Sequence, residues 1–282
     1  ENIMSPDSIL DKFDLSGRAA IVTGGPGLLG KEFCRTLAEA GAGVVIADLN
    51  GPAAQGVAEQ LTQAGYRAVA APTDVTDPSS TRQMVQTALD AFGRLDILVN
   101  SAALDPKFDP EALKNRTTPL GAFEDYPLEA WKAALDVNLT GMFLCCQAAV
   151  QPMLAQGKRG SIINICSTYG LVAPDQRIYQ RDGVQTSYKP IYYPVTKAGV
   201  MGLTRYLAAY YAGTEIRVNA LTPGGVFNNH DEVFLKAYSA RTVMGRMANK
   251  DEMNGALLFL ASDASSYMTG NNVVVDGGWT AW

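Results

Sequence analysis

The alternation of short apolar runs with amphipathic helical segments limits the possible folds of this chain more than any other feature. From Arg18 onward, runs of strand length alternate with segments of helical periodicity. This order is typical of a parallel sheet with helices on both faces. We therefore expect an α/β fold, with a doubly wound parallel sheet of about seven strands in a single domain over residues 1–282. The expected strands are Ala19–Thr23, Val44–Ala47, Ala68–Ala71, Leu95–Asn100, Ser161–Ser167, Arg217–Thr222 and Asn272–Val275.

Two segments, near 104–126 and 171–190, are too long for simple connections in such a sheet. Both follow the carboxyl ends of expected strands, the edge at which ligands bind in open parallel sheets. Long loops at that edge are often functional, so we expect these insertions to face the substrate. Surface elaboration or an oligomer contact is the alternative. Their polar side chains include Asp105, Lys107, Asn115, Arg116, Arg177, Gln180 and Arg181.

Composition excludes several classes of protein. The 282 residues are 47% hydrophobic and 18% charged, which suits a soluble chain with a substantial core. A net charge of −5 without a Lys/Arg cluster argues against nucleic-acid binding. The apolar runs are too short to predict a membrane span. No apolar leader is visible at the start, and the four cysteines (Cys34, Cys145, Cys146, Cys166) form no C-x-x-C pair. Reduced, packed cysteines predict a cytoplasmic protein, and a single histidine, His230, predicts no metal site.

The segment Thr23–Gly30, read T-G-G-P-G-L-L-G, lies between the first expected strand and its helix. Glycines in this context let the backbone approach a pyrophosphate at a helix N-terminus. Asp48 closes the second strand, 18 residues after Gly30, where a carboxylate can bind both ribose hydroxyls of an adenosine. It would repel a 2′-phosphate, and no Lys or Arg follows directly. These signals predict a Rossmann-type domain that binds NAD rather than NADP, unless Asp48 is only a turn residue.

Tyr193 and Lys197 form the only Tyr-x-x-x-Lys spacing in the sequence. Pro194 suits the first position of a helix, which puts the two side chains on one face. A nearby ammonium lowers the phenol pKa from its ordinary value of about 10. The pair can then act as a general acid/base near neutral pH. Taken alone, it could equally be an incidental pair at an exposed helix start.

Together these motifs resemble the short-chain dehydrogenases/reductases over residues 15–278. Further segments match motifs of that family: Asp74-Val75, Asn100–Ala103, Asp136–Leu139, Asn164–Ser167, Pro223-Gly224 and the tail from Phe259 to Gly278. The resemblance implies an NAD-dependent enzyme acting on CH–OH groups, with Asn138, Ser167, Tyr193 and Lys197 as catalytic residues. The cofactor-binding positions it implies are Gly24, Gly27, Leu28, Leu29, Asp48, Asp74, Val75, Asn100, Ala102, Tyr193, Lys197, Pro223, Gly224, Val226 and Asn228.

Three departures from the family pattern stand out. Leu28 replaces a glycine of the compact branch, so the loop resembles that of the extended branch, which contains nucleotide-sugar epimerases and dehydratases. The Asp-Gly-Gly tail nevertheless favours the compact branch. Ser101 and Ala103 replace Asn and Gly in the fourth-strand motif. Ser167 and Tyr193 are 26 residues apart, more than is usual in the family, because the second insertion lies between them.

The resemblance also implies a role for each catalytic residue. During oxidation Tyr193 takes the hydroxyl proton and Ser167 positions the substrate oxygen. Lys197 lowers the tyrosine pKa and holds the nicotinamide ribose, while Asn138 holds a water that relays protons. Ser167, Tyr193, Arg177 and His230 are the expected substrate contacts.

The polar insertions favour a sugar, sugar acid or nucleotide sugar as substrate, unless their side chains simply face water. The overall likeness to members associated with bacterial surface sugars agrees with this. A catalytically idle NAD-binding regulator and an epimerase or dehydratase with retained NAD stay open as alternatives. Family members are commonly tetramers, so we expect a homotetramer or homodimer. Tyr206–Tyr211, Trp279 and Trp282 would suit its interface, or the core of one chain.

Overall fold

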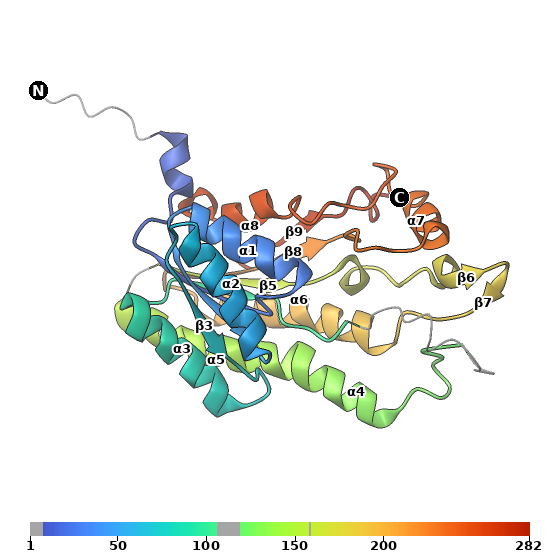
Figure 1. Cartoon of the computed structure of the whole chain (residues 1–282), viewed down its shortest axis with the longest axis horizontal. Coiled ribbons are helices and arrows are strands. Elements are labelled where there is room, and N and C mark those ends of the chain that lie inside the picture. Colours follow the sequence, from blue (N-terminus) through green and yellow to red (C-terminus); the bar gives the residue numbers. More distant parts are fainter. Residues whose placement is uncertain (1–7, 106–118, 158) are drawn as a thin grey trace, which may run out of the picture.

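Within residues 8–105, 119–157 and 159–282, which the computed structural model describes, seven parallel strands form the central sheet (Figure 1). Their order is β3-β2-β1-β4-β5-β8-β9, and each strand pairs in parallel with its neighbours. The doubly wound parallel sheet expected from the sequence is thereby confirmed. The strands are β1 (Ala19–Thr23), β2 (Gly43–Asp48), β3 (Ala68–Pro72), β4 (Ile97–Asn100), β5 (Gly160–Ile165), β8 (Ile216–Pro223) and β9 (Asn272–Val275).

Helices cover both faces of the sheet and enclose two hydrophobic clusters. One cluster joins α1, α2 and α8 to the sheet, and the other joins α3, α5 and α6 to the opposite face (Figure 1). Apolar side chains at helical spacing account for both, as the sequence pattern predicted. The helices are α1 (Leu28–Glu39), α2 (Gly51–Gln63), α3 (Pro78–Phe92), α4 (Leu128–Leu135), α5 (Met142–Gln156), α6 (Tyr192–Tyr210), α7 (Glu232–Ser239) and α8 (Asn254–Ala261).

The predicted ends of several strands need small corrections. Leu95 and Asp96 precede β4, and the Leu95 backbone N–H and C=O pair with the Gln156 side-chain amide instead of a neighbouring strand. Cys166 and Ser167 lie beyond the end of β5. Ser167 instead opens a short 3₁₀ turn, where its hydroxyl accepts a hydrogen bond from the Tyr169 backbone at 3.2 Å.

Helical structure continues without a break from Leu128 to Gln156, through a π-helical stretch at Asp136–Gly141. This run of 29 residues is long and apolar enough to cross a membrane by length and composition, which the short apolar runs of the sequence did not suggest. However, 56% of its most apolar window is buried inside the protein, and α5 packs in the cluster with α3 and α6. The run is therefore a core helix of this fold.

The two insertions contact each other. The second contains a 3₁₀ turn at Gln176–Tyr179 and a small hairpin of β6 (Gln180–Arg181) and β7 (Val184–Gln185). Leu120, from the first insertion, pairs with the strand-like segment beyond β7: its N–H donates to Thr186 O, and Tyr188 N–H donates to Leu120 O at 2.8 Å. Residues 106–118, which include the noted Lys107, Asn115 and Arg116, lie outside the described residues.

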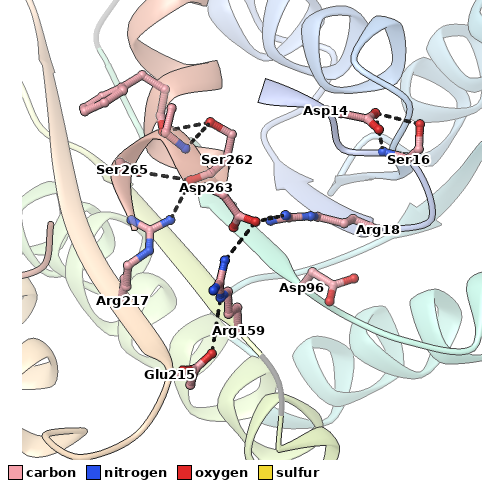
Figure 2. Close-up of polar contacts among 12 residues, drawn as sticks. Asp14, Ser16, Arg18, Asp96, Arg159, Glu215, Arg217, Ser262, Asp263 and Ser265 are labelled. Atoms are coloured by element: carbon pink, nitrogen blue, oxygen red, sulfur yellow. Dashed lines mark hydrogen bonds and ion pairs between the residues drawn. The ribbon is translucent and has the colours of Figure 1, made fainter. Parts of the chain in front are cut away.

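A charged network lies at the amino ends of β1, β5 and β8, opposite the edge that carries the glycine loop (Figure 2). The Asp263 carboxylate pairs with Arg18 at 2.8 Å and with Arg159 at 2.9 Å. Arg159 also pairs with Glu215 at 3.3 Å. Arg217 lies beside them and donates to three backbone carbonyl oxygens. Asp263 therefore neutralises a group of arginines that holds three strand ends together.

Asp263→Asn should lower the thermal midpoint by about 2–4 °C at pH 7, because the arginines lose their shared counter-charge. Burial alone would raise the pKa of Asp263, but hydrogen bonds and charges from Arg18 and Arg159 hold it below its ordinary value. The stabilisation is thus present above the ordinary carboxyl pKa and is lost as the pH falls through the depressed one. Calorimetry from pH 7 to pH 3 should show the thermal midpoints of the wild type and Asp263→Asn converging as the pH falls. A difference in thermal midpoint that stays constant with pH would contradict this account. So would an equal drop in the midpoint of Glu59→Gln, an exposed change on α2.

Candidate active site

The predicted site residues gather along the carboxyl edge of the sheet. Thr23 ends β1, Asp48 ends β2, Asn100 ends β4 and Pro223 ends β8, while Ser167 follows the end of β5. The chain runs outward from β1 to β3 and then returns to β4 on the other side of β1. Open parallel sheets bind ligands in the crevice at such a reversal of strand order. The topology therefore gives the site a location that spacing alone could only suggest.

The glycine loop has the geometry that a dinucleotide cradle needs. Gly24 has φ +67°, and a Cβ there would lie 2.9 Å from the Ala102 backbone. A Cβ on Gly30 would lie 2.1 Å from Gly24 O, so the helix start and the turn touch directly. Gly27 is the N-cap of α1 and has no side chain to occupy the free N–H groups there. These features fit a pyrophosphate at the helix N-terminus.

Leu28, the departure from the family pattern, causes no clash in the loop. It is the first residue of α1 and is 38% exposed, whereas Leu29 packs against the hydrophobic cluster below. The side chain at position 28 therefore lies on the exposed side of the first turn of α1. The substitution is therefore compatible with the cradle.

The positions expected to hold the adenosine end at β2 and β3 are well defined. Asp48 Oδ1 accepts a hydrogen bond from Asn50 N–H at 2.8 Å, so the turn role left open by the sequence is present. A carboxylate has capacity for further donors, and ribose hydroxyls can still bind. The Asp74 carboxylate accepts two bonds from Thr76, and Val75 lies against Gly141. Contact of these residues with adenosine stays a prediction.

Asn100 and Ala102 differ in how they relate to the crevice. Asn100 is buried, and its amide donates to Asn164 Oδ1 at 2.9 Å, which joins β4 to β5. Ala102 N–H donates to Thr23 Oγ1 at 3.1 Å and lies against Gly24 at the edge of the cradle. The side chain of Asn100 thus supports the sheet, while the backbone of Ser101 and Ala102 lies against the loop.

Residues after β8 leave the same edge of the sheet on the other side of β5. Gly224 packs so closely on Asp276 that a Cβ would lie 2.7 Å from its Cα, and Val226 forms a bridge with Ala248. The Asn228 backbone N–H donates to His230 Nδ1 at 3.2 Å. Whether Pro223, Gly224, Val226 and Asn228 hold the nicotinamide stays a prediction.

The serine, tyrosine and lysine of the expected catalytic group are brought together. Helix α6 begins at Tyr192, two residues before the predicted start, so Pro194 is its third residue. The first four N–H groups of a helix have no partner within it, and the proline costs no hydrogen bond. Ser167 hydrogen-bonds the Tyr193 phenol, and Lys197 Nζ lies 5.8 Å from the Tyr193 ring centroid. The long segment between Ser167 and Tyr193 therefore forms a loop that leaves the two side chains in contact.

Burial sets the protonation of this group in the protein alone. Desolvation raises the pKa of Tyr193, and the negative charge of Asp105 adds to the effect, while the Ser167 hydrogen bond works against both. The pKa of Lys197 is lowered to about 8, again mainly by burial. Its ammonium donates to Ile165 O at 2.8 Å. The prediction that Lys197 gives the phenol a lowered pKa is wrong for this state, because burial outweighs the charge of one ammonium.

Asn138 lies in the π-helical stretch between α4 and α5. Single π turns inside α-helices are frequent at functional sites. The Asn138 side chain accepts from Leu104 N–H at 2.7 Å and donates to Leu104 O at 3.1 Å. It also contacts Thr196 Oγ1 on α6 at 3.3 Å. Asn138 therefore fixes the start of the first insertion against the helix that carries Tyr193 and Lys197.

The two further substrate residues predicted from the sequence differ in their placement. Arg177 donates twice to Asp175 and its side chain is 73% exposed, an arrangement that gives no support to substrate contact. His230 stacks on Phe234 with ring centroids 5.0 Å apart. Burial lowers its pKa, and the charges of Asp231, Lys189 and Asp105 act on it as well. His230 therefore belongs to the polar surroundings of the catalytic group.

Lys189 is the site residue that sequence reasoning missed. Its Nζ lies 3.9 Å from the centroid of the Tyr193 ring, nearer than that of Lys197, and 2.5 Å from Asp105 Oδ1. The available signal was its place four residues before Tyr193, at the end of the polar insertion. Spacing could not show that it folds back over the tyrosine ring.

Aromatic side chains complete the surroundings of Tyr193. The Tyr169 ring meets Tyr193 edge-on at 6.5 Å and Trp279 at 6.2 Å, and Tyr238 stacks on Trp279 at 4.3 Å. Trp279 is therefore part of the core of one chain, one of the two roles that the sequence left open. In the single chain Tyr206 is 63% exposed, Tyr210 is 66% exposed and Trp282 is 78% exposed.

Comparison with known proteins agrees with this geometry. Residues 28–280 match the family model described as enoyl-(acyl carrier protein) reductase. The chain is 36% identical to cis-4-hydroxycyclohexanecarboxylate dehydrogenase of Sinomonas cyclohexanicum, covering 94% of this chain and 97% of that one. It is 34% identical to D-threitol dehydrogenase of Mycolicibacterium smegmatis, covering 95% of each.

A solved structure is similar over nearly the whole chain. It is a gluconate 5-dehydrogenase from Burkholderia cenocepacia in complex with NADP and tartrate, with TM-score 0.83, 33% identity, and coverage of 98% of this chain and 100% of that one. The chain belongs to the short-chain dehydrogenase/reductase family. It is accordingly an oxidoreductase of the class that acts on CH–OH groups.

Proposed function

We propose that the protein is an NAD-dependent dehydrogenase that interconverts a secondary alcohol and a ketone on a polar, sugar-like substrate, including the oxidation of a sugar hydroxyl to a keto group or lactone. The observation that carries this proposal is the meeting of Ser167, Tyr193 and Lys197 beside the nucleotide cradle. These groups come from the end of β5 and the first turns of α6, both fixed by the core.

The chain's own groups can manage the proton of the reaction. The alcohol oxygen would lie between the Ser167 hydroxyl and the Tyr193 phenol, which are hydrogen-bonded to each other. During oxidation the alcohol proton passes to Tyr193 Oη as the C=O bond forms, and Ser167 donates to the same oxygen. Bound NAD would supply the hydride acceptor for the carbinol hydrogen. Lys197, held by Ile165 O, stabilises the phenolate that accepts the proton.

Asp48 supports NAD as the cofactor. A carboxylate at the end of β2 accepts bonds from ribose hydroxyls and repels a 2′-phosphate. The sequence places Leu49, Asn50 and Gly51 after it, with no cation to offset that repulsion. The related gluconate 5-dehydrogenase binds NADP, so the choice of cofactor has to be measured on this chain.

Asp48→Ala should lower the preference for NAD over NADP by about tenfold or more in kcat/KM, because repulsion of the 2′-phosphate and the ribose hydrogen bonds are both lost. Both cofactors are assayed with the same alcohol by absorbance at 340 nm. Asp90→Ala, an exposed change at the far end of α3, serves as the control. An unchanged preference in Asp48→Ala would show that another group selects the cofactor.

A polar substrate follows from the charged groups around Tyr193. Lys189, Asp105 and His230 lie there beside the aromatic rings described above, and they offer hydrogen bonds that a steroid or acyl chain would leave unused. The relatives include a dehydrogenase of D-threitol and one of gluconate. We test the function by following NADH formation with a panel of polyols, sugars, sugar acids and sugar nucleotides. Absence of NADH with every compound would reject the proposal.

The two alternatives are less well supported. An epimerase or dehydratase retains its NAD, so release of NADH would exclude that class of enzyme. The relatives named above are also dehydrogenases. An idle NAD-binding regulator would not need Asn138, Ser167, Tyr193 and Lys197 in one assembly.

We further propose a cytoplasmic homotetramer or homodimer that binds neither nucleic acid nor membrane. The exposed Tyr206 and Tyr210 on α6 offer an interface, and light scattering measures the assembly.

A further inference from the structure

The ion pair of Lys189 and Asp105 joins the two insertions directly at the catalytic tyrosine. The residues are 84 positions apart, and Lys189 Nζ lies 2.5 Å from Asp105 Oδ1. The same ammonium lies over the Tyr193 ring, 3.9 Å from its centroid. The charge of Asp105 acts on Tyr193, Lys197 and His230 alike. The pair therefore lies against the ring of the tyrosine that is expected to transfer the proton.

Both members of the pair have a fixed backbone. Lys189 N–H donates to Gln176 Oε1 at 2.9 Å, and Gln176 Nε2 donates back to Lys189 O at 3.3 Å. Leu104, the residue before Asp105, is held by two hydrogen bonds with the Asn138 side chain. Such supports hold a binding group in place before the ligand arrives, which reduces the entropy lost on binding.

The two partners differ in their access to solvent. The side chain of Lys189 is 14% exposed and that of Asp105 is 56% exposed. An ammonium has three N–H donors and a carboxylate has about four acceptor positions, and the pair uses one of each on itself. The mostly enclosed ammonium thus offers donors, and the more open carboxylate offers acceptors, at one place in the site.

A neutral hydroxyl satisfies both groups at once. A hydroxyl donates one proton to the carboxylate and accepts from the ammonium. A substrate carboxylate would be repelled by Asp105, and a substrate amine by Lys189. An apolar group would desolvate the ion pair without replacing its hydrogen bonds, which is costly.

From these contacts we propose that Lys189 and Asp105 bind a second hydroxyl, on the carbon next to the one that is oxidised, so that the enzyme selects vicinal diols. In this arrangement the ammonium over the face of the tyrosine ring would donate to that neighbouring hydroxyl. This inference rests on the proposed function and assigns its substrate class. Lys189 and Asp105 are specificity-determining residues in it, while Tyr193 performs the proton transfer.

The test compares cyclohexanol with cis-cyclohexane-1,2-diol, which differ by one hydroxyl, using the full chain with saturating NAD. We expect the wild-type kcat/KM to favour the diol by about tenfold or more. Lys189→Met should reduce this ratio at least tenfold, and Asp105→Asn should reduce it several-fold. A general effect on the Tyr193 proton changes both alcohols alike and cancels in the ratio. Lys132→Met, an exposed change on α4, should keep the wild-type ratio.

Two results would overturn the inference: no wild-type preference for the diol, or the wild-type ratio in Lys189→Met. If that variant does not fold, Lys189→Gln, which keeps length and polarity but removes the charge, is read in the same way. Failure of the proposed function looks different, because no alcohol would then yield NADH. In that case calorimetry of the same two compounds with the full chain and NAD decides, and equal affinity rejects the diol site.

Discussion

Tyr193→Phe should reduce turnover by about 10²–10⁴-fold, the usual contribution of a positioned general acid/base. The change removes only the phenolic oxygen that hydrogen-bonds Ser167 and leaves the ring between Tyr169 and the Lys189 ammonium. The cradle at Gly24–Gly30 is untouched, so NAD affinity should stay within about threefold. Steady-state NADH formation measures the first effect, and titration of NAD by fluorescence measures the second.

Tyr192→Phe is the matched control, since it removes the same atom one residue earlier on α6. Tyr192 is buried against the Tyr126 ring at 6.1 Å and is not among the groups assigned to the reaction. Its turnover should stay close to wild type. Wild-type turnover in Tyr193→Phe, or equal losses in both variants, would defeat the assignment of Tyr193 as the proton acceptor.

The raised pKa of Tyr193 adds a pH dependence to this prediction. Below that pKa the phenol keeps its proton, so it is ready to donate to a carbonyl during reduction. Oxidation needs the ionised form, whose fraction grows as the pH rises toward the pKa. The oxidation rate should therefore increase from pH 6 to pH 10, and the reduction rate should not. An oxidation rate that is flat over this range would mean that proton transfer from the alcohol does not limit turnover.

Gly30→Ala should weaken NAD binding at least tenfold and lower the thermal midpoint, because one methyl group cannot fit where α1 touches the glycine turn. Its Cβ would lie 2.1 Å from Gly24 O and 2.8 Å from Gly25 O, both backbone atoms that cannot turn aside. Relief requires α1 to move away from the turn, which spoils the helix N-terminus as an anion site. Overpacking of this kind costs about 1–3 kcal/mol.

Gly56→Ala gives the control on the next helix. Position 56 lies inside α2, and a Cβ there meets nothing within 4 Å. The change should stabilise the protein by about 0.4–1 kcal/mol, since alanine loses less backbone entropy than glycine in a helix. Thermal unfolding with and without NAD separates the two effects. Normal NAD affinity in Gly30→Ala would show that the loop does not bind the cofactor as proposed.

Local patterns were sufficient to predict the sheet and its helices. The Asp77-Pro78 start of α3 and the Gly93 end are cap signals within one turn of the chain, and the helix begins and ends at the residues that they indicate. The strand boundaries at Leu95 and Ser167 were misplaced because contacts outside the local sequence decide them. The Leu95 backbone bonds the distant Gln156 side chain, and Ser167 opens a turn.

The site shows a similar division. Tyr193 and Lys197 share a face because both lie on one helix, and spacing alone predicts that. The π-helical turn at Asn138 and its hold on Leu104 depend on packing against α6, which no periodicity describes. Arg177 was expected at the substrate because it is charged and lies in the insertion, yet Asp175 engages it at the surface.

By itself, the sequence determined the doubly wound sheet, the glycine cradle, the carboxylate at Asp48 and the likeness of the catalytic group to one enzyme family. Each of these depends on contacts within a few residues or on a repeated period. The tertiary structure decided that burial, not Lys197, governs the pKa of Tyr193, and that Lys189 and Asp105 meet above that ring. Both depend on residues far apart in the chain, because solvent exclusion and long-range pairing exist only once the chain has folded.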